Sequence, residues 1–196
     1  MGKVVVVNSV TLDGVMQAPG RPDEDVRGGF EHGGWAQPYM DDVMGQVMGE
    51  GMASNSSLLF GRRTYEDFAG FWPRQVDNPF TPILNEKQKY VASTTLREPL
   101  PWQNATLLIG DAPDAVAKLK EQSDADVTVL GSGELVRSLM RHELVNEYYL
   151  LIHPLILGSG RRLFADSGPM APLRLTNSVT TTTGVVIATY VPTDKA

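Results

Sequence analysis

The segment at residues 57–66 carries residue types that could bind a phosphate group, and it reads Ser-Leu-Leu-Phe-Gly-Arg-Arg-Thr-Tyr-Glu. Its short apolar run is typical of a buried strand, and Thr64 with Asp67 three residues later indicates the start of a helix. The first amides of a helix are unpaired and partly positive, and adjacent arginines add donors that suit a phosphate. An ordinary strand-to-helix connection with two solvated arginines is the alternative interpretation, because short motifs often match by chance. The residues of this predicted anion site are Gly61, Arg62, Arg63 and Thr64.

A second segment repeats the same design. Residues 127–130 are a β-branched apolar run, residues 131–133 read Gly-Ser-Gly, and residues 134–140 have apolar side chains at helical spacing. In open α/β sheets, ligands bind beyond the carboxyl ends of the strands, and glycines there let the backbone approach a pyrophosphate. Two such junctions in one chain predict a bound dinucleotide, with its pyrophosphate at residues 131–133 and a more distant phosphate at the first segment.

Three aspartates could supply a carboxylate near these turns. Asp13 follows residues 3–7, a valine run that is typical of a central strand covered on both faces, so it would face the same crevice. The alternative is that Asp13 only closes the Asp-Gly turn through its own backbone. Asp41 and Asp42 lie in the first turn of a helix predicted over residues 37–52. Carboxylates there suit the helix dipole, and a substrate-binding role weighs evenly with this structural one.

Residues 16–38 are predicted to form a loop, because they are rich in glycine and proline. A loop of more than about 15 residues in a compact domain is usually a lid, a binding loop or disordered. This one also contains aromatic residues, which favours a flap over the ligand.

The chain has three dispersed histidines. His32 in the loop could donate a proton, although a lone loop histidine is more often solvated. His153 lies in an apolar run and is interpreted as a core residue paired with the backbone, and His142 as a surface residue. With no cysteine in addition, a dedicated metal site is not expected.

The length of 196 residues suits one α/β domain over residues 1–196. The net charge of −6 argues against binding to nucleic acid or to an anionic membrane, since both need a basic face. The absence of cysteine excludes disulfides and cysteine nucleophiles and fits a cytoplasmic protein. The first residues lead directly into a strand without a signal peptide, and no apolar run approaches the roughly 20 residues of a membrane span.

Strand and helix patterns alternate along the middle of the chain, which predicts a mostly parallel sheet, and the last two strands form a hairpin that closes it in the antiparallel sense. Residues 74–82 are predicted to be a proline-containing loop. The other predicted elements are a short helix ending at Pro73, strands at 90–93, 106–109 and 146–157, a helix at 114–122, and the hairpin strands 173–179 and 185–191.

Taken in order, these segments resemble dihydrofolate reductase, and they resemble more closely the reductase domain at the C-terminus of the bifunctional riboflavin-biosynthesis enzyme RibD. The motifs concerned are residues 61–66, residues 131–135, and the strand through His153-Pro154 to residues 158–164. The early Ser-Leu-Asp-Gly turn of that domain is matched by Thr-Leu-Asp-Gly at 11–14. The deaminase half of the bifunctional enzyme needs cysteine ligands, so this chain cannot deaminate.

The resemblance implies a dihydrofolate reductase-like three-layer α/β/α sandwich, NADPH as the hydride donor, and a homodimer. By position, the first segment would hold the adenosine side of NADPH, with Arg62 or Arg63 on the 2′-phosphate. The strand end at Ser93 and Thr94 would assist there. The residues that would hold the pyrophosphate are Gly131, Ser132, Gly133 and Glu134, with Leu135 packed beneath.

The implied activity is hydride transfer from NADPH to a C=N or C=O group of a small pterin- or pyrimidine-like substrate. A carboxyl group with a raised pKa, or a water that it orients, would donate the proton. Asp13 is the first candidate, followed by Asp42 and Asp41. True dihydrofolate reductases place a single acid in the helix after the first loop, and Asp41 and Asp42 are only approximate counterparts.

Two other classes of function compete with a reductase. Phosphoryl transfer is disfavoured, because the chain lacks the lysine of a Gly-x-x-x-x-Gly-Lys loop. A non-catalytic module that binds a nucleotide and dimerises is the stronger alternative, since a fold does not fix a function.

Overall fold

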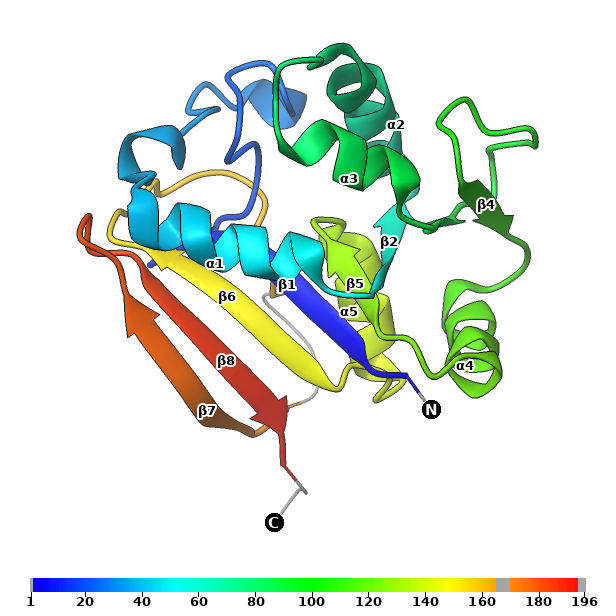
Figure 1. Ribbon diagram of the computed structural model, residues 1–196. Coiled ribbons are helices and arrows are strands. Elements are labelled where there is room, and N and C mark those ends of the chain that lie inside the picture. Colours follow the sequence, from blue (N-terminus) through cyan, green and yellow to red (C-terminus); the bar gives the residue numbers. More distant parts are fainter. Residues whose placement is uncertain (1, 165–169, 194–196) are drawn as a thin grey trace.

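The valine-rich run near the N-terminus forms strand β1 (Val4–Thr11), which lies inside an eight-stranded sheet of order β4-β3-β2-β5-β1-β6-β8-β7. The computed structural model describes residues 2–164 and 170–193 (Figure 1). Val4, Val6 and Val10 are buried on one face of β1, and the side chains that alternate with them on the other face are half-buried, so both faces of the strand are covered at least in part. The single domain predicted over residues 1–196 extends beyond the described residues at both ends.

The first six strands of the sheet order run parallel, and the last two are antiparallel to their neighbours. This confirms the predicted mostly parallel sheet with a C-terminal antiparallel hairpin. The remaining strands are β2 (Ser57–Gly61), β3 (Lys89–Ala92), β4 (Ala105–Leu108), β5 (Val127–Leu130), β6 (Glu147–His153), β7 (Leu173–Thr180) and β8 (Val186–Pro192).

Helices cover the two faces of the sheet in different groups (Figure 1). On one face, α1 (Asp42–Ala53) packs on β6 and β8, while α2 (Arg62–Phe71) and α3 (Phe80–Glu86) pack on β2 and β3. On the other face, α4 (Ala112–Gln122) and α5 (Gly133–Arg141) pack on β1, β2 and β5. None of the helices in the described part of the chain has the length and apolar character needed to cross a bilayer.

The structure differs from the predicted elements at three places. The helix predicted over residues 37–52 begins at Asp42, after a short 3-10 turn at Gln37–Tyr39, because Asp41 caps the helix. Helix α3 lies partly in the segment predicted to be a loop. Its proline, Pro82, sits in the first turn, where a missing amide costs no helix bond. The strand predicted to reach residue 157 ends at His153, because Pro154 cannot continue the ladder.

The predicted loop over residues 16–38 is folded around its own apolar cluster. Trp35 is buried there, and its indole Nε1 donates to the carbonyl of Gln17 at 2.7 Å. The Gln17 amide nitrogen in turn donates to the carbonyls of Asp25 and Arg27. The aromatic residues therefore hold the loop in one shape beside the end of β1, which is where a flap over a ligand would lie.

Candidate functional site

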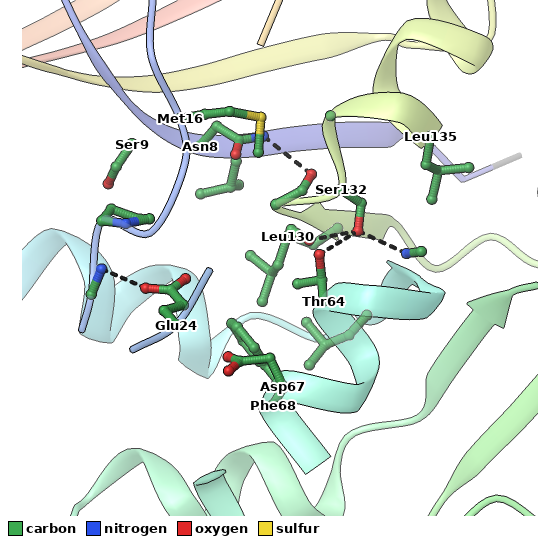
Figure 2. Close-up of a pocket in the computed structure, with 18 of the residues that line it drawn as sticks. Asn8, Ser9, Met16, Glu24, Thr64, Asp67, Phe68, Leu130, Ser132 and Leu135 are labelled. Atoms are coloured by element: carbon green, nitrogen blue, oxygen red, sulfur yellow. Dashed lines mark hydrogen bonds between the residues drawn. The ribbon is translucent and has the colours of Figure 1, made fainter. Parts of the chain in front are cut away.

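The two glycine corners are the strand-to-helix turns at Gly61, between β2 and α2, and at residues 131–133, between β5 and α5. Both open into one cleft, which has a volume of 1770 Å³. The cleft lies on the face of the sheet that carries α1 and α2, and it reaches the carboxyl ends of β1, β2 and β5. Its walls include Met44 of α1, Phe68 of α2, and Asn8 and Ser9 of β1. Figure 2 shows part of this cleft, with α2 on one side and the start of α5 on the other.

Ser132 joins the two corners directly. Its hydroxyl accepts a hydrogen bond from the amide of Gly61 at 2.7 Å and donates to the Thr64 hydroxyl at 2.9 Å (Figure 2). Ser132 is the N-cap residue of α5, and its side chain makes no hydrogen bond to that helix. The starts of α2 and α5 are therefore fixed against one another, as a single site built on both junctions requires.

The corners need glycine mainly because they pack so closely. A Cβ atom on Gly61 would lie 3.2 Å from the Ser132 hydroxyl oxygen, and one on Gly131 would lie 3.1 Å from a methyl group of Thr64. Gly131 and Ser132 also have positive φ angles, 59° and 60°, so the chain turns sharply before α5 begins. This close packing is a different reason for glycine from the approach of a pyrophosphate that the sequence suggested.

Helix amides and arginines supply the cleft with anion-binding groups. The first amides of α2 and α5 have no acceptor within their own helices. Arg62 pairs with Glu66 at 3.2 Å and Arg63 lies 3.9 Å from Glu134, both at exposed positions where ion pairs are weak. These two arginines can therefore exchange a carboxylate for a phosphate at little cost. The other arginines that line the cleft are Arg21, Arg27, Arg137, Arg161 and Arg162.

The remaining predicted cofactor residues, Ser93, Thr94 and Leu135, also line the cleft. Ser93 and Thr94 follow β3, and the Ser93 hydroxyl accepts from the amides of Thr95 and Leu96. Leu135 is buried beneath Gly61, and its Cβ lies 3.8 Å from the position that a Cβ atom on Gly61 would take. Ser93 thus caps a turn, which is the alternative that its sequence left open.

Asp13 is engaged in a structural clamp at the end of β1. Its carboxylate accepts hydrogen bonds from the Thr11 hydroxyl at 2.6 Å and from the amides of Leu157 at 3.2 Å and Gly158 at 2.9 Å. The Thr11 hydroxyl and these amides hold the pKa of Asp13 below its usual value. Asp13 is not among the residues that line the cleft, and a carboxyl group with a lowered pKa is a poor proton donor.

Asp41 and Asp42 also lie outside the lining of the cleft. Asp41 caps α1 through the Met44 amide and accepts hydrogen bonds from the Thr182 hydroxyl and amide at 2.6 and 2.7 Å. The Thr182 hydroxyl is the main cause of the lowered pKa of Asp41. Asp42 is exposed in the first turn of α1. Their proposed role in proton transfer stays a prediction, and the geometry offers it no contact with the cleft.

Of the acidic residues that line the cleft, Glu24 and Asp67 have raised pKa values, and the sequence analysis singled out neither of them as a site residue. Glu24, from the loop, accepts from the amides of Gly20 and Arg21, and burial raises its pKa. Asp67 lies on α2, where burial also raises its pKa and where it binds Arg21. Figure 2 shows the two side chains entering the same pocket from different elements. Asp67 could have been found from its spacing to Thr64, but Glu24 depends on how the loop folds.

His153 is fully buried at the edge of the cleft. Its Nδ1 lies 3.0 Å from the carbonyl of Leu151, and its ring packs edge-on against Trp35 and Tyr39. Burial lowers its pKa. This is the core histidine that the sequence indicated. Among residues 2–164 and 170–193, no three His, Cys, Asp or Glu side chains lie together as metal ligands.

Solved structures share this architecture over nearly the whole chain. A putative riboflavin biosynthesis protein from Shewanella sp. PV-4 aligns over 98% of this chain and 99% of its own, with a TM-score of 0.70 and 19% identity. A pyrimidine reductase-like protein from Corynebacterium diphtheriae aligns with a TM-score of 0.65 and 11% identity, over 99% and 93% of the two chains. Dihydrofolate reductase from Enterococcus faecalis, solved with NADP(H), aligns over 98% of both chains with a TM-score of 0.63 and 11% identity.

The fold is thus that of the dihydrofolate reductase-like class. The sequence profile of the RibD C-terminal domain matches residues 2–187, and the chain belongs to that family. It is also similar to two Bacillus subtilis (strain 168) proteins. Uncharacterized protein YyaP is 28% identical over 194 residues, which is 96% of this chain and 94% of YyaP. Uncharacterized protein YwjB is 28% identical over 119 residues, which is 61% of this chain and 64% of YwjB.

Proposed function

We propose that this protein is an NADPH-dependent reductase that transfers a hydride to a C=N or C=O group of a small pterin- or pyrimidine-like substrate. The observation that carries the proposal is the contact of Ser132 with both Gly61 and Thr64, which makes one site of two helix starts. Family membership supports the same activity. The fold alone would not, because a fold can host many functions.

The residues of the cleft fit a dinucleotide that carries an extra phosphate. The start of α5 at Gly133 and Glu134 offers backbone amides for the pyrophosphate, and Arg62 and Arg63 at the start of α2 offer guanidinium groups for the 2′-phosphate. NADPH, when bound, supplies the hydride. The protein holds the cofactor and the substrate next to one another. The loop over residues 16–38 would exclude water from the end of the cleft where the nicotinamide ring binds.

Titration with NADPH and NADH tests the cofactor assignment. We expect wild type to prefer NADPH, and we expect Arg62→Ala or Arg63→Ala to reduce that preference by roughly ten- to hundredfold, because each charge-assisted bond contributes about 1.5–3 kcal/mol. Arg74→Ala is the matched control, since Arg74 is exposed and does not line the cleft. Equal affinity of wild type for NADPH and NADH would remove the phosphate assignment.

Turnover separates a reductase from a nucleotide-binding module of the same fold. The alternative has one observation in its favour, since none of the three predicted proton donors lines the cleft. We expect the protein to oxidise NADPH in the presence of at least one of dihydrofolate, the ribosylaminopyrimidine intermediate of riboflavin synthesis, or a simple pterin. The loss of NADPH absorbance measures this oxidation. Tight NADPH binding with no oxidation on any of the three would favour the binding module.

A further inference from the structure

The cleft has two parts that differ in charge. One part, around the glycine corners, is lined by arginines. Arg27 and Arg63 both interact with Glu134 in the first turn of α5, and Arg137 on α5 donates to the carbonyl of Arg162 at 2.9 Å. This arginine-rich part is the one proposed above to hold the phosphates of NADPH. Its arginines are Arg27, Arg62, Arg63, Arg137, Arg161 and Arg162.

The other part, which we call the apolar groove, runs between α1 on one side and α2 with α3 on the other (Figure 1). Its α1 wall carries Met44, Met48 and Met52, which are four residues apart and so lie on one side of the helix. Met52 packs into the same apolar cluster as the aromatic rings of α2 and α3, so the two walls meet there. The rings of the opposite wall are those of Phe68, Trp72 and Phe80.

The floor of the apolar groove is one face of the central strand β1. Val5, Val7 and Ser9 line the cleft and are only half-buried, whereas the valines that alternate with them are buried under α4 and α5. A parallel strand in the middle of a sheet is normally covered on both faces. Apolar surface left partly open in this place favours a ligand that covers it, and a groove with such walls suits a flat ring.

Helix α1 presents no positive charge to the apolar groove. Residues 42–53 contain neither lysine nor arginine, and the charged residues among them are Asp42 and Glu50. His153, at the edge of the cleft, is neutral at pH 7, because burial lowers its pKa. An anionic substituent beside α1 would therefore lose its water without gaining a positive partner, which is unfavourable.

The cations that line the cleft away from the corners already have partners. In the part of the chain that the structure describes, they are Arg21 and Lys87. Arg21 binds Asp67. Lys87 Nζ donates to the carbonyls of Ser54 at 2.6 Å and Ser56 at 2.9 Å, and burial lowers the pKa of this lysine. An anion in the apolar groove could recruit either cation only by breaking these contacts.

We propose that the apolar groove binds the substrate and selects flat, uncharged rings over the same rings with a phosphate or carboxylate substituent. This inference rests on the proposed function, because it names the substrate class of that reaction. Of the compounds named above, it favours the simple pterin over dihydrofolate, which carries carboxylates, and over a ribosylaminopyrimidine that carries a phosphate. The methionines of α1 let the groove fit rings of different shape, because their side chains are flexible and polarizable.

The experiment compares two pterins that share one ring and differ in the charge of one substituent, 6-hydroxymethylpterin and pterin-6-carboxylate. Their fluorescence gives the affinity of each in the presence of NADP⁺, which occupies the arginine-rich part and has no hydride to transfer. Met48→Lys places a cation in the apolar groove. Met40→Lys does so just before α1, at a cleft position that is 49% exposed and so tolerates a lysine.

Gln46→Lys is the matched control, because Gln46 is exposed on the same helix and does not line the cleft. It adds the same charge to α1 outside the apolar groove. Thermal melting of each variant checks that it folds, and Met40→Lys carries the test if Met48→Lys does not fold.

We expect wild type to bind 6-hydroxymethylpterin at least about tenfold more tightly than pterin-6-carboxylate, because the apolar groove would bury the carboxylate without a partner. Met48→Lys should strengthen binding of the carboxylate by about tenfold or more, since it adds a charge-assisted hydrogen bond. Met40→Lys should strengthen it by about threefold, since an exposed ion pair is weaker. Gln46→Lys should match wild type for both pterins.

The inference is overturned if wild type binds the two pterins equally, prefers the carboxylate or binds neither. It is also overturned if the folded groove variants gain no more affinity for the carboxylate than Gln46→Lys does. NADP⁺ titration and NADPH oxidation test the reductase proposal separately. If the groove selects the uncharged pterin but the protein neither binds NADP⁺ nor oxidises NADPH, the reductase proposal fails and the charge selection stands. Equal rates of NADPH oxidation with both pterins would reject the charge selection and keep the reductase.

Discussion

Lys89 shows how one buried residue can complete a helix. Its side chain is fully buried, and Nζ donates to the carbonyls of Leu84 at 2.7 Å, Asn85 at 3.1 Å and Lys87 at 2.7 Å. These carbonyls lie at the C-terminal end of α3, where they have no donors within the helix and where a cation is favoured. The ammonium also lies 4.6 Å from the centre of the Trp102 ring.

We expect Lys89→Met to destabilise the protein at neutral pH by about 1–3 kcal/mol, because the carbonyls of Leu84 and Lys87 lose the hydrogen bonds that Nζ donates. Burial lowers the pKa of Lys89 to about 8. Because the unfolded lysine still binds its proton up to about pH 10, stability contributed at this position should rise between those values as the folded lysine loses its charge. Urea titration of wild type and Lys89→Met at both ends of this pH range gives the difference between their free energies of unfolding. A difference that is the same at both pH values would contradict the lowered pKa of Lys89.

At the same scale, the sequence pointed to the glycines and arginines that line the cleft. It did not show which carboxylates face the cleft. Glycine and arginine types identify the corners, because a helix start binds anions wherever it lies in the fold. A carboxylate is different, since Asp13 becomes a clamp only through amides at Leu157 and Gly158, more than a hundred residues away. Nothing in the sequence near Asp13 distinguishes a structural clamp from a residue that lines the cleft.

At the scale of elements, two carboxylates each join two elements that lie far apart in the sequence. Asp13 joins the end of β1 to the segment after β6, and Asp41 joins the start of α1 to the turn between β7 and β8. Both have a lowered pKa in the folded protein. Each therefore adds stability that is present above the unfolded value of about 4 and is lost as the pH falls through the lower folded value.

We expect Asp13→Asn and Asp41→Asn to lower Tm at neutral pH, and their effect to shrink as the pH falls below about 4, where wild type loses the same interactions. Differential scanning calorimetry across this range tests the prediction, with Asp77→Asn as the exposed control. A difference between wild type and variants that stays the same at all pH values would contradict it.

The elements themselves were predictable where one pattern dominated the local sequence. The valine run of β1 and the glycine junctions before α2 and α5 fall as predicted. Helix α3 does not, because Pro82 reads as a loop residue, although a proline in the first turn is compatible with a helix. Its end is capped by the side chain of Lys89, which turns back from the start of β3 onto the last carbonyls of the helix.

At the scale of the whole molecule, the C-terminal hairpin gives the sheet one long edge that has no partner strand among residues 2–164 and 170–193. Strand β7 is the last in the sheet order, and all eight of its residues are exposed. Leu173, Leu175 and Val179 are 36%, 49% and 37% exposed, which is unusual for apolar side chains on a strand. An open edge of this length pairs readily with another strand, and natural proteins usually protect such an edge with charges or prolines.

We propose that a second copy of the chain covers this edge, since two identical antiparallel edges are complementary about a twofold axis. Light scattering after gel filtration should give twice the mass of 21.4 kDa for wild type. Leu175→Lys places a charge on the edge and should yield the monomer mass, while Val76→Lys, at a site 80% exposed in the loop before α3, should remain a dimer. A monomeric wild type, or a Leu175→Lys variant that stays dimeric, would show that this edge is not where two copies meet.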